Sequence, residues 1–144
     1  VDFDRPVSES DIRNLTPDVR QGDVFEMVDA IGYGDGSTAM KMMHRLLEES
    51  DALPLFGMII RQFRLLIQVL EQINDHPDRD HQAIAKKLGQ HPYPIKKILP
   101  QARQFTMDQL RRIYSRLSEV DEAIKTGQLD PELALDVLVA SLTE

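Results

Sequence analysis

Residues 83–99 read AIAKKLGQHPYPIKKIL, and this stretch decides the fold class. A short helix over residues 83–88 is predicted to end at Gly89, because glycine is the residue most often found just past the last helical turn. Pro92 and Pro94 then restart a second helix, since proline is well tolerated in a first turn. Each helix carries a pair of lysines. The outline fits either a DNA-reading helix-turn-helix or a helical module that docks on partner proteins.

The composition excludes several classes of protein. With 144 residues, the chain suits a single domain with a core of its own. It has no cysteine, which excludes disulfides and thiolate metal sites and agrees with a reducing, cytoplasmic location. No apolar run approaches the roughly 20 residues that span a bilayer, so no membrane segment is expected. Residues 1–6 lack signal-peptide features and an initiator methionine, so we expect a piece of a longer chain.

The charge of the chain is unevenly distributed. The net charge of -7 argues against a free-standing nucleic-acid binder, because neutralising phosphates takes an excess of lysine and arginine. Residues 1–60 hold about seven more acids than bases, whereas residues 79–116 hold about nine bases against two acids. This polarity suits docking against charged neighbours, and the alternative interpretation is an ordinary solvated face.

Helical periodicity runs through everything after residue 20, and no stretch alternates as a strand does. We therefore predict an all-α helical bundle of about six or seven helices. Their signals are a capping box at Ser8–Asp11, the segment 24–31, a cap at Ser37 or Thr38, the segments 54–73 and 83–88, a start at Pro94, a capping box at Thr106, and the segment 132–142.

The helix over residues 54–73 is the longest of these. Its polar residues recur three or four positions apart and therefore share one stripe. They are Arg61, Arg64, Gln68, Glu71 and Gln72. Apolar residues cover most of the remaining circumference, and a helix of this kind packs on several sides or lies partly at a subunit interface.

The last two helices are defined by their apolar residues. The helix behind Thr106 is expected to stop at Gly127. Its seam has a 3-4-3-4 spacing and consists of Leu110, Ile113, Leu117, Val120 and Ile124. Asp130 and Pro131 provide an N-cap followed by proline at the first helical position. The final helix, 132–142, is mostly apolar and is expected to bury deeply.

No arrangement in the sequence predicts catalysis, a cofactor or a metal. The glycines at 32, 34 and 36 follow a helix and lack the Gly-Lys-Ser/Thr ending of a phosphate loop. Residues 75–81 contain metal-ligand types, but their spacing matches no recognised site and loops favour the same residues for turns. No nucleophile–base motif is found. We therefore expect no enzymatic activity from this chain on its own.

A helix-turn-helix regulator that uses residues 80–105 is the alternative function. The apolar skeleton of that motif is matched by Ile84, Ala85, Leu88, Ile95 and Ile98. Its recognition helix should insert N-terminal residues into the major groove. Those positions hold two prolines here, which leaves few side chains able to read base edges.

Four blocks of the sequence carry a family resemblance. They are VFEMVDAI at 24–31, RQFRLL at 61–66, IAKKLGQHPYPIKK at 84–97, and the closing pattern of Asp121, Ile124, Lys125 and Gly127 followed by Leu133-Ala134-Leu135. In this order they resemble the delta subunit of the bacterial DNA polymerase III clamp loader. Their joint occurrence is far more specific than any one of them alone.

The resemblance implies an AAA+ subunit without ATPase activity, whose C-terminal helical collar joins gamma/tau and delta-prime subunits in a five-membered ring. This chain matches only the collar, expected over residues 21–144. Residues 1–20 are then the end of the preceding middle (lid) domain or a linker. The implied function is assembly of a clamp loader for DNA replication, as part of a DNA-directed DNA polymerase holoenzyme. Sliding-clamp contact belongs to N-terminal domains absent here, and DNA contact is indirect.

We expect contacts between subunits from the 54–73 helix or the seam behind Thr106, with the basic 79–116 region steering the encounter. The candidate contact residues are Arg61, Phe63, Arg64, Tyr93, Lys96, Lys97, Arg111 and Tyr114.

Two positions depart from the family pattern. Pro100 falls inside the helix that starts at Pro94 and removes its hydrogen bond to the Lys96 carbonyl, so we expect a kink or a helix broken in two. The turn over residues 127–130 lacks an aromatic side chain that could stack on a nucleic-acid end. Any DNA contact there rests on Lys125 alone.

Overall fold

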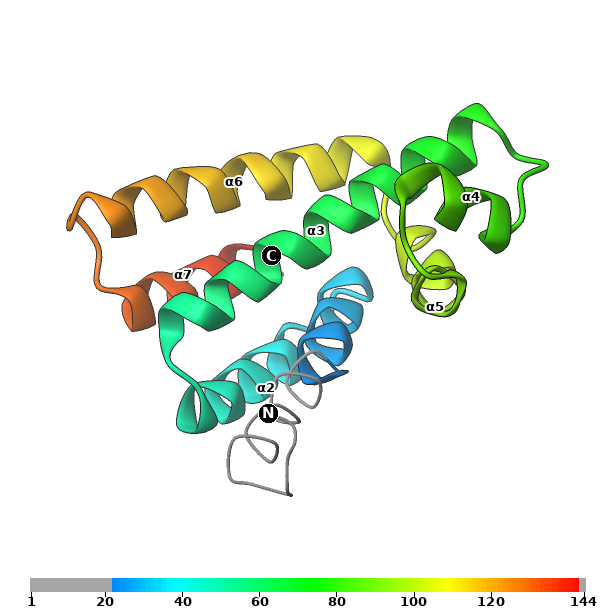
Figure 1. The fold of residues 1–144 in the computed structure, drawn as a ribbon. Helices are drawn as coiled ribbons and strands as arrows, with labels where there is room; N and C mark the ends of the chain where they lie inside the picture. The colour runs from blue at the N-terminus through cyan, green and yellow to red at the C-terminus, as the bar shows by residue number, and fades with distance from the viewer. Residues whose placement is uncertain (1–21, 143–144) are drawn as a thin grey trace, which may run out of the picture.

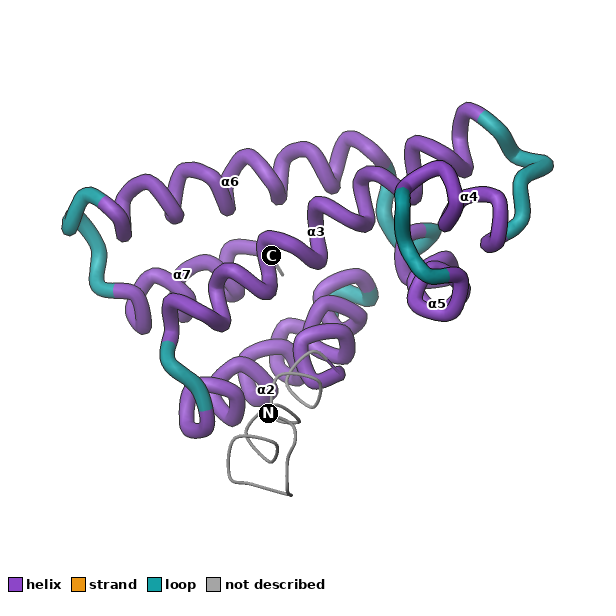
Figure 2. Tube along the Cα trace, in the orientation of Figure 1, coloured by secondary structure: helices purple, strands orange, loops and turns teal. Residues whose placement is uncertain are grey.

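A computed structural model describes residues 22–142 of the chain. This part contains seven helical segments and no strand, which confirms the predicted all-α fold (Figure 2). The segments are residues 22–32, α2 (Gly36–Glu49), α3 (Ala52–Asp75), α4 (His81–Leu88), α5 (Pro92–Ala102), α6 (Met107–Lys125) and α7 (Pro131–Leu142). The helix predicted to open at Ser8, and the predicted first domain at residues 1–20, lie outside the described residues.

Helix α3 is the central element of the fold. It contacts all five of the other labelled helices, and Figure 1 shows α6 returning along its length. Its buried residues are Ala52, Leu55, Phe56, Ile59, Phe63, Leu66, Val69 and Leu70. The prediction that this helix packs on several sides is therefore confirmed.

Helix α3 also corrects an expectation about membranes. By length and composition alone it is apolar enough to cross a bilayer, although the sequence was expected to hold no such segment. Arg61 and Arg64 interrupt the apolar run but do not lower the mean hydropathy of the helix enough to exclude it. Because its buried face forms the core together with α5, α6 and α7, we assign α3 as a core helix.

Residues 83–99 form most of α4 and α5, which pack against each other. Gly89 ends α4 with a φ of +68°, a left-handed conformation that glycine adopts without strain. Helix α5 begins at Pro92, two residues before the predicted start at Pro94. Both prolines fit because the N–H groups of a first turn have no partner within the helix.

Of the two outcomes predicted at Pro100, a kink or a helix broken in two, the break is wrong. Helix α5 is a single helix that ends at Ala102, so Pro100 lies in its last turn. A proline there removes one N–H from the ladder, and the helix stops two residues later instead of restarting. The N–H of Arg103 still donates to the Leu99 carbonyl at 3.2 Å.

The end of α5 also buries a polar side chain. Gln101 is 1% exposed and is the one buried polar residue among residues 22–142. Its Nε2 donates to the Phe25 carbonyl at 2.9 Å and to Asp29 Oδ1 at 3.4 Å. Its Oε1 accepts from Gln62 Nε2 at 2.8 Å. These hydrogen bonds connect the 22–32 helix, α3 and α5.

Helix α2 is capped by a different residue from those predicted. The sequence favoured Ser37 or Thr38, but the N-cap is Asp35. Its Oδ2 accepts from the Thr38 hydroxyl at 2.7 Å, and its Oδ1 accepts from the Thr38 N–H at 3.1 Å. These hydrogen bonds, that from the hydroxyl first, hold the pKa of Asp35 below its ordinary value.

The capping box predicted at the start of α6 is confirmed. The Gln109 N–H donates to Thr106 Oγ1 at 3.1 Å, and the Thr106 N–H donates to Gln109 Oε1 at 2.9 Å. The α6 seam divides by burial: Leu110, Leu117 and Ile124 are buried, whereas Ile113 and Val120 are partly buried.

Replacing Thr106 with alanine is expected to lower the free energy of unfolding by about 1 kcal/mol, because the Gln109 N–H loses its acceptor. Urea denaturation followed by circular dichroism measures this change. Ser115→Ala, at an exposed position in the middle of α6, is the matched control and should leave stability unchanged or slightly higher. Equal losses in both variants would contradict a stabilising role for the cap.

The last helix buries less of its surface than predicted. Its cap is confirmed, since Asp130 Oδ2 accepts from the Leu133 N–H at 3.2 Å. One face is buried, and it consists of Ala134, Leu135, Leu138 and Val139. On the other face Leu133 is 56% exposed and Val137 is 61% exposed. The prediction of deep burial is therefore correct for one face of α7 and wrong for the other.

Candidate functional site

Five of the candidate contact residues lie on α3 and α6, and four of them, all but Phe63, have surface exposure. The Arg64 guanidinium donates to the Tyr114 hydroxyl, at 2.9 Å from Nη2 and 3.2 Å from Nε. Arg111 Nη2 lies 3.9 Å from Glu71 Oε2. Arg61 is exposed one turn before Arg64. We call Arg61, Arg64, Arg111 and Tyr114 the α3–α6 basic face, and its cations are exposed and held only by surface contacts, which are individually weak.

A hollow of about 460 Å³ adjoins this face. Arg61 and Arg64 line one side of it, and Gln90 and Pro94 line another. The hollow therefore links the arginines of α3 to the start of α5. A concave surface with a cationic border is suited to binding an acidic side chain of a partner protein.

The three candidate residues on α5 have different surroundings. Tyr93 is 70% exposed, so its ring is available to a partner. Lys96 is also exposed. The ammonium group of Lys97 lies 5.4 Å from the centre of the Phe25 ring, a cation–π contact that holds it against the 22–32 helix. Lys97 therefore already has an intramolecular partner, the Phe25 ring.

Phe63 must be removed from the candidate surface. It is 0% exposed, and its ring meets that of Phe105 edge to face with centres 5.9 Å apart. Its neighbour Arg64 is exposed. Adjacent residues of a helix point about 100° apart, so an exposed residue can directly follow a buried one. Phe63 is a core residue.

Lys125 is paired within its own helix. Its Nζ lies 2.8 Å from Asp121 Oδ2, and this hydrogen bond raises the pKa of Lys125 above its ordinary value. The lysine thus stays charged but already has a carboxylate partner. A role in DNA contact has to compete with that pair.

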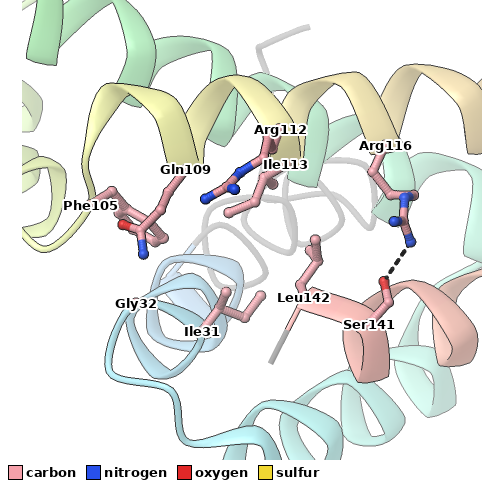
Figure 3. A pocket seen from close by; sticks show the side chains of 9 residues that line it. All are labelled: Ile31, Gly32, Phe105, Gln109, Arg112, Ile113, Arg116, Ser141 and Leu142. Atoms are coloured by element: carbon pink, nitrogen blue, oxygen red, sulfur yellow. Dashed lines mark hydrogen bonds between the residues drawn. The ribbon is translucent and has the colours of Figure 1, made fainter. Parts of the chain in front are cut away.

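Sequence reasoning missed the exposed apolar residues between α6 and α7. Leu129, Leu133 and Val137 are exposed beside the partly buried Val120, and a hollow of about 110 Å³ lies among them. A second hollow, of about 300 Å³, is shown in Figure 3 and lies between the 22–32 helix, α6 and α7. The available signal was the composition of α7, which is too apolar for one buried face.

The described part of the chain shows no arrangement that assembles a reaction centre. Among residues 22–142, no three His, Asp or Glu side chains lie close enough together to hold a metal ion. The polar loop before α4 serves the backbone instead, because Asp80 Oδ1 accepts from the Ala83 N–H at 2.9 Å and caps the helix.

Comparisons with known proteins agree with the fold and with the sequence blocks. A family model described as the C-terminal domain of the DNA polymerase III delta subunit matches residues 21–142. DNA polymerase III subunit delta of Bacillus subtilis (strain 168) is 26% identical over 137 residues, which cover 94% of this chain and 39% of that protein. A solved structure, the Bacillus subtilis DNA clamp loader delta protein, matches with a TM-score of 0.79 and 26% identity, over 86% of this chain and 36% of that one. The chain thus spans well under half the length of these relatives.

Proposed function

Because this chain belongs to the family formed by the C-terminal domains of DNA polymerase III delta subunits, we propose that it is the collar through which a delta subunit assembles with gamma/tau and delta-prime subunits in the cytoplasm. Residues 21–144 form the collar, and residues 1–20 close the preceding domain or link to it. The sliding clamp is reached through other domains of the full-length protein. DNA is met only in the assembled complex.

The observation that supports this proposal best is the α3–α6 basic face. Its arginines are exposed on a chain whose net charge is -7, so they form a local reversal of sign. Such reversals steer and orient protein partners more than they add affinity. The adjoining hollow and the exposed Tyr93 supply the concave and aromatic features that subunit interfaces favour.

The test uses the full-length protein mixed with the gamma/tau and delta-prime subunits of the same organism. Light scattering after gel filtration should show one heteromeric complex. Arg61→Glu combined with Arg64→Glu is expected to weaken assembly at least tenfold, because two cations of the α3–α6 basic face become repulsive.

The matched control is Lys41→Glu combined with Arg45→Glu, which makes the same charge change at exposed positions of α2. It should weaken assembly less than threefold. Failure of the wild-type protein to join a complex of competent partners overturns the proposed function. If the two double variants weaken assembly equally, the α3–α6 basic face is not the contact surface between subunits.

The helix-turn-helix regulator has weaker support. Helices α4 and α5 pack in the order that motif requires, but the first turn of α5 presents Pro92, Tyr93 and Pro94 in place of base-reading amides. The family match over residues 21–142 also accounts for the same residues as part of a clamp-loader subunit.

A further inference from the structure

Helix α7 is apolar on two faces, and only one of them is covered in the described structure. Within its twelve residues the charged side chains are Glu132 and Asp136. Asp136 Oδ1 lies 2.8 Å from His44 Nε2 and so faces α2. Leu133 and Val137, four residues apart, are more than half exposed. A helix with this distribution is expected to pack on a second neighbour.

The uncovered face of α7 opens into a groove along α6. The hollow of about 110 Å³ has apolar walls, which are Val120, Leu129, Leu133, Ala134, Val137 and Leu138. The hollow of about 300 Å³ lies farther along the same two helices. Arg116 and Ser141 line both hollows, and Arg116 Nη1 donates to Ser141 Oγ at 3.2 Å between them (Figure 3). We call this continuous surface the α6–α7 groove.

The charges of the α6–α7 groove have a single sign. Arg112 and Arg116 are the charged residues that line its two hollows, and no carboxylate of residues 22–142 lines either one. Figure 3 shows both arginine side chains extending from α6 at the edge of the larger hollow. On a chain with a net charge of -7, this is a surface complementary to an acidic partner.

Arg112 and Arg116 form ion pairs with exposed carboxylates of their own helix. Arg112 lies 3.5 Å from Asp108 and Arg116 lies 3.9 Å from Glu119, each within one turn of α6. Exposed pairs of this kind contribute little to stability, because water screens the attraction between the charges. A carboxylate of a partner protein whose apolar side chains fill the groove can therefore replace Asp108 or Glu119 at little cost in free energy.

We propose that the α6–α7 groove binds an acidic amphipathic helix of a neighbouring subunit, a step that rests on the proposed function. Apolar side chains three or four residues apart fill the smaller hollow over Leu133 and Val137. An aspartate or glutamate about one turn farther on pairs with Arg116. From Leu133 to Ser141 the groove follows about 12 Å of α7, which two to three turns of a docked helix match.

Photocrosslinking of the assembled complex identifies the occupant. The full-length protein carries p-benzoylphenylalanine in place of Val137, and a matched protein carries it in place of the exposed Tyr33. The Val137 position should crosslink to another subunit, within a helix that holds an acidic residue no more than four positions from the crosslink. The Tyr33 position should not capture that segment.

Any other occupant overturns the proposal. Such outcomes are a crosslink within this chain, including residues 1–21, a crosslink to a second copy, a crosslink to a segment without a carboxylate, and no crosslink in a complex that has assembled.

Substitutions test the chemistry of the same groove. Val137→Glu and Arg116→Glu are each expected to weaken assembly at least tenfold, whereas Arg116→Lys should stay within threefold. Arg103→Glu, an equal charge change at an exposed position of the α5 terminus, is the control and should also stay within threefold. Thermal unfolding of each variant separates a folding defect from a binding defect.

The failures of the two proposals are distinguishable. If the wild-type protein does not assemble, the proposed function fails and the groove proposal falls with it. If it assembles and Val137→Glu assembles equally well, the groove proposal alone is overturned.

Discussion

Phe63→Ala is expected to lower the free energy of unfolding by about 3–5 kcal/mol, the range for removing a large buried aromatic side chain. Phe63 has no exposed surface and meets Phe105 edge to face inside the core. Its removal exposes no new surface to a partner but leaves a cavity at the centre of α3. Guanidinium chloride denaturation followed by circular dichroism measures the loss.

Arg64→Ala is the matched control, one residue along the same helix. Arg64 is exposed and contacts Tyr114 at the surface, so its loss should cost about 1 kcal/mol or less. Similar losses from both substitutions would contradict the burial of Phe63. The pair also shows why Phe63→Ala is a poor probe of assembly, since a destabilised domain loses every interface at once.

Gln101→Glu is expected to cost about 3–5 kcal/mol at pH 7, although it changes the size of the side chain very little. The introduced carboxylate keeps the hydrogen bond from Gln62 but cannot donate to the Phe25 carbonyl. It also places a second negative charge near Asp29 in a buried site. The cost is therefore that of an unpaired buried charge and not that of a cavity.

Denaturation at two pH values checks this explanation. The deficit relative to the wild-type protein should be smaller at pH 5 than at pH 7, because protonation removes the buried charge and restores a donor for the Phe25 carbonyl. Gln82→Glu, at an exposed position of α4, should stay within about 0.5 kcal/mol at both pH values. A deficit that does not change with pH would point to packing strain instead.

Local signals predicted the helices and most of their ends. Gly89, the Thr106 capping box and the Asp130 cap each act within a few residues of chain, and each is found as predicted. Where two local signals competed, the prediction was less accurate. Asp35 caps α2 in place of Ser37 or Thr38, and α5 continues through Pro100 to Ala102 without a break. Position within the turn decides what a capping residue or a proline does.

The candidate contact residues show the limit of the same reasoning. Periodicity placed Arg61 and Arg64 on the polar stripe of α3, and the structure exposes both. Periodicity could not distinguish a core residue such as Phe63 from an apolar residue at a subunit interface. Both are apolar, and only the helices that pack against them differ. The pairing of Arg64 with Tyr114 spans fifty positions of sequence and was likewise beyond a local pattern.

The sequence by itself determined the all-helical class, the order of the helices and the family, since these depend on periodicity, caps and short blocks of residues that are local to the chain. Only the tertiary structure decided which side of each apolar helix is core. It covered one face of α7 with α2 and α6, left Leu133 and Val137 open beside Arg116, and enclosed Gln101 among partners from two other helices. Burial is a property of what packs against a residue, and that is set by contacts between segments distant in sequence.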